Sequence, residues 1–315
     1  MDLKKSLRQT TVTISVIIPV YNDIERLRQV LDSIKNQLNE DIDLEVLVVD
    51  NGSTQNIRGL ITAYDFAKYI LESKNLNSPY SCRNRGIEQA EGEVIVLLDA
   101  TCIPDKSWLV NGIASFHDDI EKVVGGNVIF EIYETSTSYE ILDALTSVQM
   151  GNSISNNKRA FTANLWVSKQ LFDEFGLFPE GIRSGGDVRW TKKVAQSGIL
   201  LTYNKECTVY KSTRKKKAFR KKKWRTALQQ TNKWIHLDST YVFFRHIRAF
   251  FKLAILPPKV GRHKLQERLP YKVFESQRYL ELRIWFADYN IRIIEAFGII
   301  VGGIKHLYEA MQSNN

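Results

Sequence analysis

Three groups of polar side chains in the first hundred residues each follow directly on an apolar run. They are Tyr21-Asn22-Asp23, Asp50-Asn51 and Asp99. Each run is rich in β-branched residues and is typical of a strand buried on both faces of a parallel sheet. Ligands bind at the carboxyl ends of such strands, so we expect these groups to line one ligand-binding edge. The runs are Thr13–Val20, Leu44–Val49 and Val94–Leu98.

Carboxylates are the means by which this edge could bind a phosphorylated ligand. No Gly-x-Gly-x-x-Gly follows the first run, and no Gly-x-x-x-x-Gly-Lys-Ser/Thr occurs anywhere. Both patterns cradle nucleotide phosphates with backbone N–H groups. A nucleotide site here would therefore use side-chain carboxylates and a divalent cation, Mn²⁺ or Mg²⁺, which prefers oxygen ligands. Without further evidence Asp99 could equally end an ordinary solvated turn.

Segments with helical periodicity separate the apolar runs. Asp23 can cap a helix with one apolar face reaching to Leu38, and shorter helices are expected around Ile57–Ile61 and Arg83–Ala90. Alternation of strands and helices with short turns predicts an α/β fold with a doubly wound, mixed but mostly parallel sheet. Further along, Tyr139–Met150 has the period of a helix, and the polar stretch Gly151–Lys158 is expected to be a mobile loop.

The formal net charge of +9 is distributed unevenly along the 315 residues. Residues 1–213 contain 22 Lys and Arg against 28 Asp and Glu, a net charge of −6. Residues 214–315 contain 22 against 7, a net charge of +15. The asymmetry predicts two domains, 1–213 and 214–315. The three scattered cysteines fit a reducing cytoplasmic compartment, and no apolar run approaches the roughly 18 residues of a membrane span.

Five blocks of sequence resemble, in their order and spacing, the signatures of the family-two inverting glycosyltransferases, which have the GT-A fold. One block alone is weak evidence, but five in the family's order are specific, and they cover roughly residues 13–213. The blocks are Ser15–Asp23, Val48–Thr54, Ser81–Ile87 with Ala90–Glu93, Leu98–Cys102, and Asn164–Asp187 with its Gly185-Gly186-Asp187 end.

The resemblance implies transfer of a sugar from a nucleotide-diphospho-sugar donor to a hydroxyl acceptor, with inversion at the anomeric carbon. Asp187 would be the general base that activates the acceptor hydroxyl. Asp50 would hydrogen-bond the nucleotide base, Asn22 and Arg83 would line the nucleotide pocket, and Asp99 would hold the donor ribose or approach a metal. The expected donor-binding residues are Tyr21, Asn22, Asp50, Asn51, Arg83, Asp99 and Lys211.

Structural roles compete with these catalytic ones. Asp50 could only close a turn with Asn51-Gly52, Arg83 could be a surface residue of its helix, and Asp187 could only cap the helix that follows it.

Two residues depart from the family's pattern. Thr101 stands where the family has the second carboxylate of its Asp-x-Asp motif, and Lys211 stands where relatives often have His. Either Asp99 and the diphosphate hold the metal alone, or a neighbour such as Asp105 replaces the carboxylate, or activity is metal-independent or lost. A charged Lys cannot bind a metal, but it can pair with a diphosphate. The two departures together suggest that a fixed cation replaces some of the metal's charge.

The region after Thr213 opens with a basic run, Arg214–Arg225, in which nine of twelve residues are Lys or Arg and two are aromatic. Such a run indicates an anionic partner, and the aromatic, amphipathic segment Tyr241–Leu256 favours a membrane surface over nucleic acid. We therefore expect a cytoplasmic protein on the inner face of a membrane, with a role in bacterial surface polysaccharide or glycolipid synthesis. A lipid-linked hydroxyl acceptor is consistent with this location. The alternative is a catalytically degenerate relative that binds membranes or polyanions. The oligomeric state is not predicted.

Overall fold

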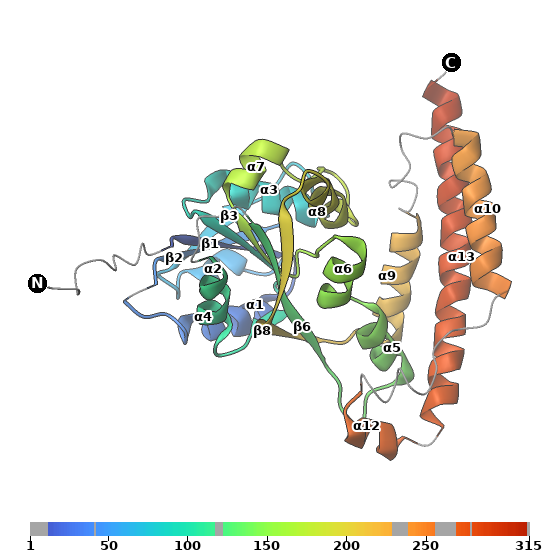
Figure 1. The fold of residues 1–315 in the computed structure, drawn as a ribbon, viewed down its shortest axis with the longest axis horizontal. Coiled ribbons are helices and arrows are strands. Elements are labelled where there is room, and N and C mark those ends of the chain that lie inside the picture. Colours follow the sequence, from blue (N-terminus) through green and yellow to red (C-terminus); the bar gives the residue numbers. More distant parts are fainter. Residues whose placement is uncertain are drawn as a thin grey trace, which may run out of the picture. The chain divides into compact units, whose positions relative to one another are not determined.

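The computed structural model describes residues 12–40, 42–116, 122–228, 239–255, 269–277 and 279–313 (Figure 1). The chain forms two compact units that alternate along the sequence. Unit 1 comprises residues 1–129 and 148–211, and unit 2 comprises residues 130–147 and 212–315. Residues 130–147 fall inside the predicted domain 1–213 but pack in unit 2. The predicted region 214–315 includes residues 229–238 and 256–268, which lie outside the described residues.

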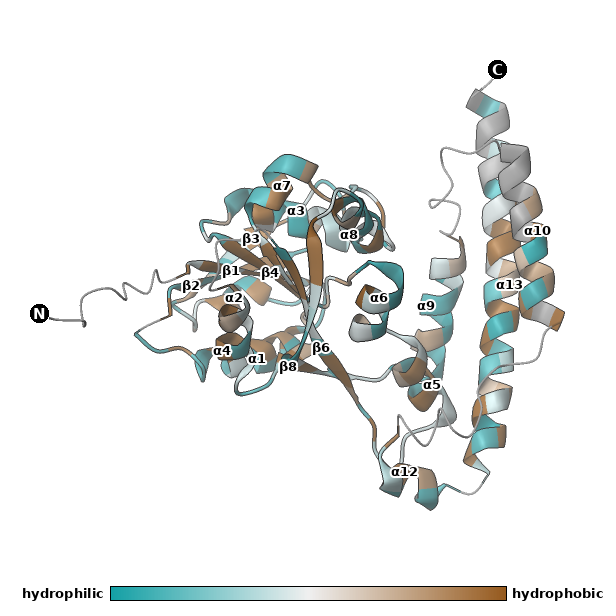
Figure 2. Ribbon diagram, in the orientation of Figure 1, coloured by the Kyte–Doolittle hydropathy of each residue, from teal (hydrophilic) through white to brown (hydrophobic). Residues whose placement is uncertain are grey.

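An eight-stranded sheet forms the centre of the described part of unit 1, and its central strands are mostly apolar (Figure 2). The strand order is β3-β2-β1-β4-β7-β6-β8-β5. The strands are β1 (Ile14–Val20), β2 (Leu44–Asp50), β3 (Ala67–Leu71), β4 (Val94–Leu98), β5 (Cys102–Pro104), β6 (Lys122–Glu131), β7 (Asn164–Ser168) and β8 (Leu200–Ser212).

The first four strands pair in parallel, which confirms the predicted α/β sheet. In the register of β1 and β2, Val20 lies opposite Asp50. The polar residues after β1, β2 and β4 therefore lie at the same edge, because parallel strands end on the same side.

Antiparallel pairing brings a distant part of the chain to this edge. β7 pairs with β4, and β8 pairs with the short strand β5. Cys102 of β5 lies opposite Lys211 of β8, which places Lys211 beside the segment that follows Asp99.

Helices pack against the sheet through apolar faces, such as Leu27, Val30, Leu31 and Ile34 of α1. Two helices differ from expectation. α3 begins at Pro79, four residues before the predicted start, and α6 occupies most of the predicted loop 151–158. The unit 1 helices are α1 (Ile24–Lys35), α2 (Ile57–Ile61), α3 (Pro79–Gln89), α4 (Trp108–Ile113), the 3-10 helix η1 (Ala114–Phe116), α6 (Met150–Asn157), α7 (Gln170–Phe175) and α8 (Gly186–Gln196).

The described part of unit 2 is helical. A separate apolar core joins Ile141 and Leu142 of α5, Phe219 of α9, and one side of the long helix α13. No helix among the described residues is both long enough and apolar enough to cross a bilayer. The helices are α5 (Ser138–Thr146), α9 (Lys216–Leu228), α10 (Ser239–Ile255), α12 (Tyr271–Ser276) and α13 (Leu280–Ser313).

Candidate active site

Hydrogen bonds join the loops that follow β1 and β2. Asn22 has a positive φ of 51°, a conformation that Asn tolerates better than most residues. Its side-chain Oδ1 accepts from the Thr54 backbone N–H at 2.8 Å, and its own N–H donates to Ser53 Oγ at 2.9 Å. Tyr21 is about half exposed beside it. The predicted residues Tyr21 and Asn22 thus lie exposed at the sheet edge, in a loop whose conformation is fixed by these hydrogen bonds.

Asp50 is buried and closes the turn after β2. Its Oδ1 accepts from the Ser53 N–H at 2.9 Å, and its Oδ2 accepts from the Tyr69 hydroxyl at 3.1 Å. The neighbouring Asn51 is also buried, and its Nδ2 donates to the Asn75 carbonyl at 3.2 Å. The turn-closing role of Asp50 is therefore present, and a carboxylate with further lone pairs can still accept a bond from a ligand.

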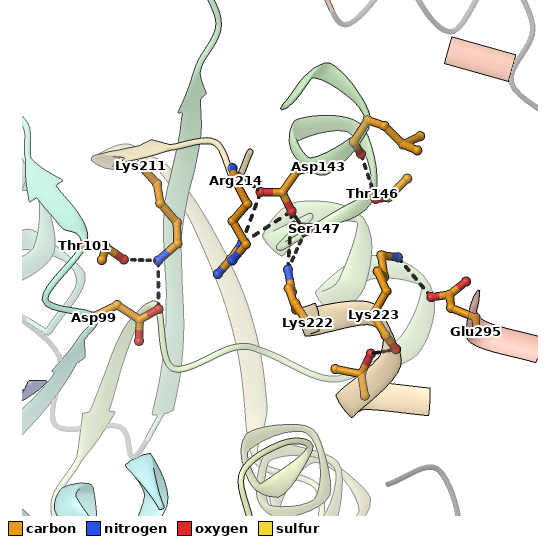
Figure 3. Close-up of polar contacts among 12 residues, drawn as sticks. Asp99, Thr101, Asp143, Thr146, Ser147, Lys211, Arg214, Lys222, Lys223 and Glu295 are labelled. Carbon is orange, nitrogen blue, oxygen red and sulfur yellow. Dashed lines mark hydrogen bonds and ion pairs between the residues drawn. The ribbon is translucent and has the colours of Figure 1, made fainter. Parts of the chain in front are cut away.

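Asp99 lies between two cations. Lys211 Nζ donates to Asp99 Oδ2 at 2.9 Å (Figure 3). On the other side, Arg83 Nη2 donates to Asp99 Oδ1 at 2.7 Å. Both cationic side chains are almost completely buried, whereas the Asp99 side chain remains about 31% exposed. The three groups carry a net positive charge beside an opening to solvent, which suits an anionic ligand.

Lys211 also contacts the residues next to Asp99. Its ammonium donates to Thr101 Oγ1 at 2.6 Å and to Cys102 Sγ at 3.3 Å. A buried ammonium needs such partners, because removing it from water without them is costly. The two departures from the family's pattern, Thr101 and Lys211, are thus direct partners in the structure.

Asp187 is buried in the first turn of α8, which follows Gly185 with its φ of 82°. The Tyr80 hydroxyl donates to Asp187 Oδ1 at 2.8 Å, and the N–H groups of Val188 and Thr162 donate at 2.8 and 3.4 Å. Burial raises the pKa of Asp187, and the bonds from Tyr80 and Val188 partly oppose that rise. Gly185 occupies the N-cap position, so Asp187 is not the cap that the structural alternative required.

Helix α3 carries a hydrogen-bond donor to Asp187, which is Tyr80, and a donor to Asp99, which is Arg83. The Arg83 guanidinium lies 5.5 Å from the centre of the Tyr80 ring, so one helix positions the partner of Asp187 and the partner of Asp99. Sequence reasoning missed Tyr80. The available signal was Ser78-Pro79: the Ser78 side chain accepts from the Ser81 N–H, and Pro79 occupies the first helical turn.

Asp23 belongs to the polar group after β1 that the sequence predicts at the ligand-binding edge, and it is also predicted to cap the helix that follows. It occupies the N-cap position of α1 but makes no side-chain capping bond. Burial raises the pKa of its carboxyl, and the Arg26 backbone N–H, followed by the positive charges of Arg26 and Lys211, partly opposes the rise. Asp105, the suggested replacement for Thr101, instead accepts from the Ser107 N–H and the Tyr210 hydroxyl.

The mixed, mostly parallel sheet with polar residues at the carboxyl ends of its parallel strands is the arrangement of the GT-A fold. The chain belongs to glycosyl transferase family 2, whose model matches residues 15–176. It is 36% identical over 253 residues to the glycosyltransferase AglE of Haloferax volcanii, covering 79% of this chain and 81% of AglE.

Solved structures show the same fold. The mannosyltransferase PcManGT of Pyrobaculum calidifontis, in complex with GDP-Man and Mn²⁺, has a TM-score of 0.54 and 16% identity, covering 97% of this chain and 76% of that chain. TarS 1-349 of Staphylococcus aureus, in complex with UDP-GlcNAc, has a TM-score of 0.53 and 18% identity, covering 96% of this chain and 92% of that chain. This confirms the GT-A fold, and the protein is a glycosyltransferase.

The side chains around Asp99 do not fit a divalent cation held by the protein. Both Asp99 oxygens face buried cations, and Thr101 supplies one neutral oxygen that already accepts from Lys211. Hard cations prefer several oxygen ligands of negative charge. Within the described ranges, no group of three or more His, Cys, Asp or Glu side chains is arranged to hold a metal ion.

Proposed function

We propose that the protein transfers a sugar from a nucleotide-diphospho-sugar donor to a hydroxyl acceptor with inversion at the anomeric carbon. The observation that carries the proposal is the arrangement of Asp187, Tyr80, Arg83 and Asp99. One helix supports a buried carboxylate at one end of this group and a cation-bound carboxylate at the other. Inverting transfer needs a base for the acceptor and a separate site for the departing diphosphate.

In the proposed step, the acceptor oxygen attacks the anomeric carbon from the face opposite the diphosphate. The new bond from carbon to acceptor oxygen forms as the bond from carbon to phosphate oxygen breaks. Asp187 takes the acceptor's proton, and the nucleoside diphosphate leaves with the bonding electron pair. The raised pKa of Asp187 makes its carboxylate a stronger base than an ordinary one.

Asp50, Asn51, Asn22 and Tyr21 are proposed to bind the nucleoside, at the rim formed by the loops after β1 and β2. Arg83 is proposed to donate a hydrogen bond to the phosphates of the donor. Its Nε–H is buried and has no hydrogen-bond partner among the described residues, although Nη1 and Nη2 are bonded. A buried donor without a partner is uncommon in a native protein and is consistent with a ligand oxygen that completes it.

In this chain, the charge that a divalent cation supplies in related enzymes is proposed to come from Lys211. A bound cation would neutralise the leaving diphosphate. Here the Lys211 ammonium lies between Asp99 and Thr101 and supplies fixed positive charge at the same edge. Arg83 adds a second positive charge on the other side of Asp99.

The acceptor is proposed to be a hydroxyl of a lipid-linked saccharide, in polysaccharide or glycolipid synthesis at the cytoplasmic face of a membrane. Support comes from the basic residues of α9. Lys217, Arg220 and Lys221 are exposed on that helix. Clusters of this kind bind anionic lipid headgroups.

A donor screen tests the proposal. The purified protein is incubated with UDP-, GDP- and dTDP-sugars, and release of nucleoside diphosphate and thermal stabilisation are both measured. We expect one nucleotide class to stabilise the protein and its sugar to be transferred or slowly hydrolysed. Stabilisation without any turnover would favour the degenerate, binding-only alternative. No response to any nucleotide would contradict the proposal.

A further inference from the structure

Helix α13 carries a row of exposed apolar side chains along most of its length, interrupted by the exposed Asn290. At about 100° per residue, the members fall within an arc of about 100°, and the row spans about 39 Å. Each is between 44% and 61% exposed. The members are Leu282, Phe286, Phe297, Val301, Ile304 and Tyr308, which we call the α13 stripe.

The opposite side of α13 differs from the stripe because it carries buried and acidic residues. Ile284, Ala287 and Ile291 belong to the buried core of unit 2. The acidic residues Asp288 and Glu295 lie more than a quarter-turn outside the arc of the stripe, by the same helical geometry. The helix therefore has one packed and acidic side and one mostly apolar side, within which Arg283 and Asn290 are exposed polar residues.

Helix α10 extends the apolar surface. Its exposed Phe244, Phe251 and Ile255 follow a helical spacing of seven and four residues. The Phe250 ring lies 5.6 Å from the Phe251 ring and 5.6 Å from the Phe297 ring, so aromatic contacts join the α10 row to the α13 stripe. These ring contacts link the two rows on a pair of neighbouring helices.

Positive charge accompanies this surface. Arg248 and Lys252 are exposed on α10, and the sequence of α10 contains no Asp or Glu. Pairing of two copies through the same face would bring these cations near one another, which is unfavourable. Anionic lipid headgroups, by contrast, complement cations that flank an apolar row.

We propose that the α13 stripe and the joined row of α10 form a membrane-contacting face that lies parallel to the bilayer surface, with the apolar side chains between headgroups. The inference rests on the proposed attachment to a membrane and names the surface responsible. The packed and acidic side of α13 would face away from the lipid, as in interfacial amphipathic helices. Tyr308, near one end of the stripe, is a residue type enriched at such interfaces.

Vesicle flotation tests the face. The full-length protein and the variant Leu282→Ser/Phe286→Ser/Ile304→Ser are floated with phosphatidylcholine vesicles containing phosphatidylglycerol. We expect the wild type to float and the variant to bind at least about tenfold more weakly, because it loses three apolar anchors. The matched control is Leu71→Ser/Val110→Ser/Leu200→Ser, which removes equally exposed apolar residues of unit 1 and should float as the wild type does.

Two results would overturn the inference. One is unchanged flotation of the stripe variant. The other is a wild type that light scattering shows to be a dimer and a stripe variant that it shows to be a monomer, with equal vesicle binding by both. That result would mean that the stripe binds a second copy of the chain. Thermal melting checks that each variant is folded. The stripe substitutions should leave donor turnover without vesicles unchanged. If the wild type shows no turnover, the proposed catalysis is contradicted, and flotation alone then decides whether the membrane face exists.

Discussion

Asp187 combines burial with hydrogen bonds from Tyr80, Val188 and Thr162, which is the environment of a fixed carboxylate with altered basicity. We expect Asp187→Asn to keep this packing and to lose the base. A positioned base contributes about 10²- to 10⁴-fold, so kcat should fall by that factor while donor affinity changes little. Steady-state kinetics and titration of the nucleoside diphosphate measure the two quantities. A variant with normal turnover and weak donor binding would place Asp187 in the nucleotide site instead.

Tyr80 is expected to set the pH range of the reaction. Its hydrogen bond lowers the pKa of Asp187, although burial raises that pKa overall. In Tyr80→Phe the lowering contribution is lost, so the pKa of Asp187 should rise. Because the base must be ionised, the acidic limb of the kcat/KM profile should move to higher pH. The control is Tyr64→Phe, which removes a similar 2.7 Å bond to Asp32 and should leave the profile unchanged.

Lys211 is expected to make donor binding independent of divalent cations. The binding of nucleoside diphosphate, measured by calorimetry, should persist in EDTA, and Lys211→Ala should weaken it at least about tenfold because a fixed positive charge is removed. Lys205→Ala on the same strand is an exposed control. Binding that EDTA abolishes and Mn²⁺ restores in the wild type would refute this role.

The reverse exchange is a second check on the same idea. Thr101→Asp combined with Lys211→His restores the family's residue types at both positions. That variant should bind nucleoside diphosphate only when Mn²⁺ is present.

The sequence was sufficient to predict that Asp50, Asp99 and the residues after β1 share one edge, because parallel strands determine where their carboxyl ends lie. It did not predict the contacts of Asp99. Lys211 reaches Asp99 through the antiparallel pairing of β5 with β8, which joins residues more than a hundred positions apart and has no local signal. The roles of the site residues remain predictions.

At the scale of elements, a buried carboxylate links α5 to α9. Asp143 is fully buried and accepts from Ser147 Oγ at 2.6 Å and from the Arg214 N–H at 2.9 Å, with Lys222 Nζ at 3.5 Å (Figure 3). Removing one partner of a buried ion pair costs about 3–5 kcal/mol. We expect Asp143→Asn to lose an amount near the lower end, since Arg214 and Lys222 are partly exposed. Chemical denaturation measures the loss. Glu206→Gln, which disrupts an exposed pair, should change stability little.

The pH dependence of that loss follows from the charge of Asp143. Burial alone would raise its pKa, but Lys222 and Arg214 outweigh burial, and the pKa is lowered. A lowered pKa in the folded state adds stability above the pKa of the unfolded chain, and this stability disappears as the pH falls through the folded value. The difference between wild type and Asp143→Asn should therefore be full at neutral pH and shrink below about pH 4. A difference that stays constant to lower pH would exclude the ionic origin.

Element boundaries were predicted less well than element types. Gly151–Lys158 looked like a loop because its side chains are mostly polar, yet Met150 and Ile154 are four residues apart and both are buried. Two apolar residues at helical spacing were enough to dock α6, and so short a pattern is ambiguous in sequence alone. Tyr139–Met150, expected as one helix, is interrupted after Thr146, and Val148 has a φ of 22°.

At the scale of the whole molecule, the basic run of residues 214–225 contains residues that form ion pairs within unit 2 and residues that are exposed to solvent. Lys222 and Lys223 contact Asp143 and Glu295 within unit 2. Lys215, Lys216, Lys217, Arg220 and Lys221 are exposed, and Lys216 Nζ lies 5.1 Å from the centre of the Tyr139 ring. Near an anionic surface each such charge contributes about 1 kcal/mol.

Replacing Lys215, Lys217, Arg220 and Lys221 with Gln should therefore weaken binding to phosphatidylglycerol-containing vesicles at least about 100-fold. Wild-type binding should also weaken with added salt, because the contacts are screened. Co-sedimentation measures both effects. Gln at Lys35, Lys106, Lys192 and Lys205 removes the same charge from exposed positions elsewhere and should have a smaller effect. Tighter binding to single-stranded nucleic acid than to these vesicles would indicate a different partner.

The order of the two units along the chain limits how the protein can be divided. The chain leaves unit 1 after Ile129, returns at Val148 and leaves again after Lys211. A protein truncated after Thr213 would retain α5 but lack Phe219 and α13, and Ile141 and Leu142 would then face water. Recombination could therefore not add the C-terminal helices to a complete catalytic domain as one contiguous segment. Any exchange between relatives would have to carry residues 130–147 together with the C-terminal helices, as a coupled pair of segments.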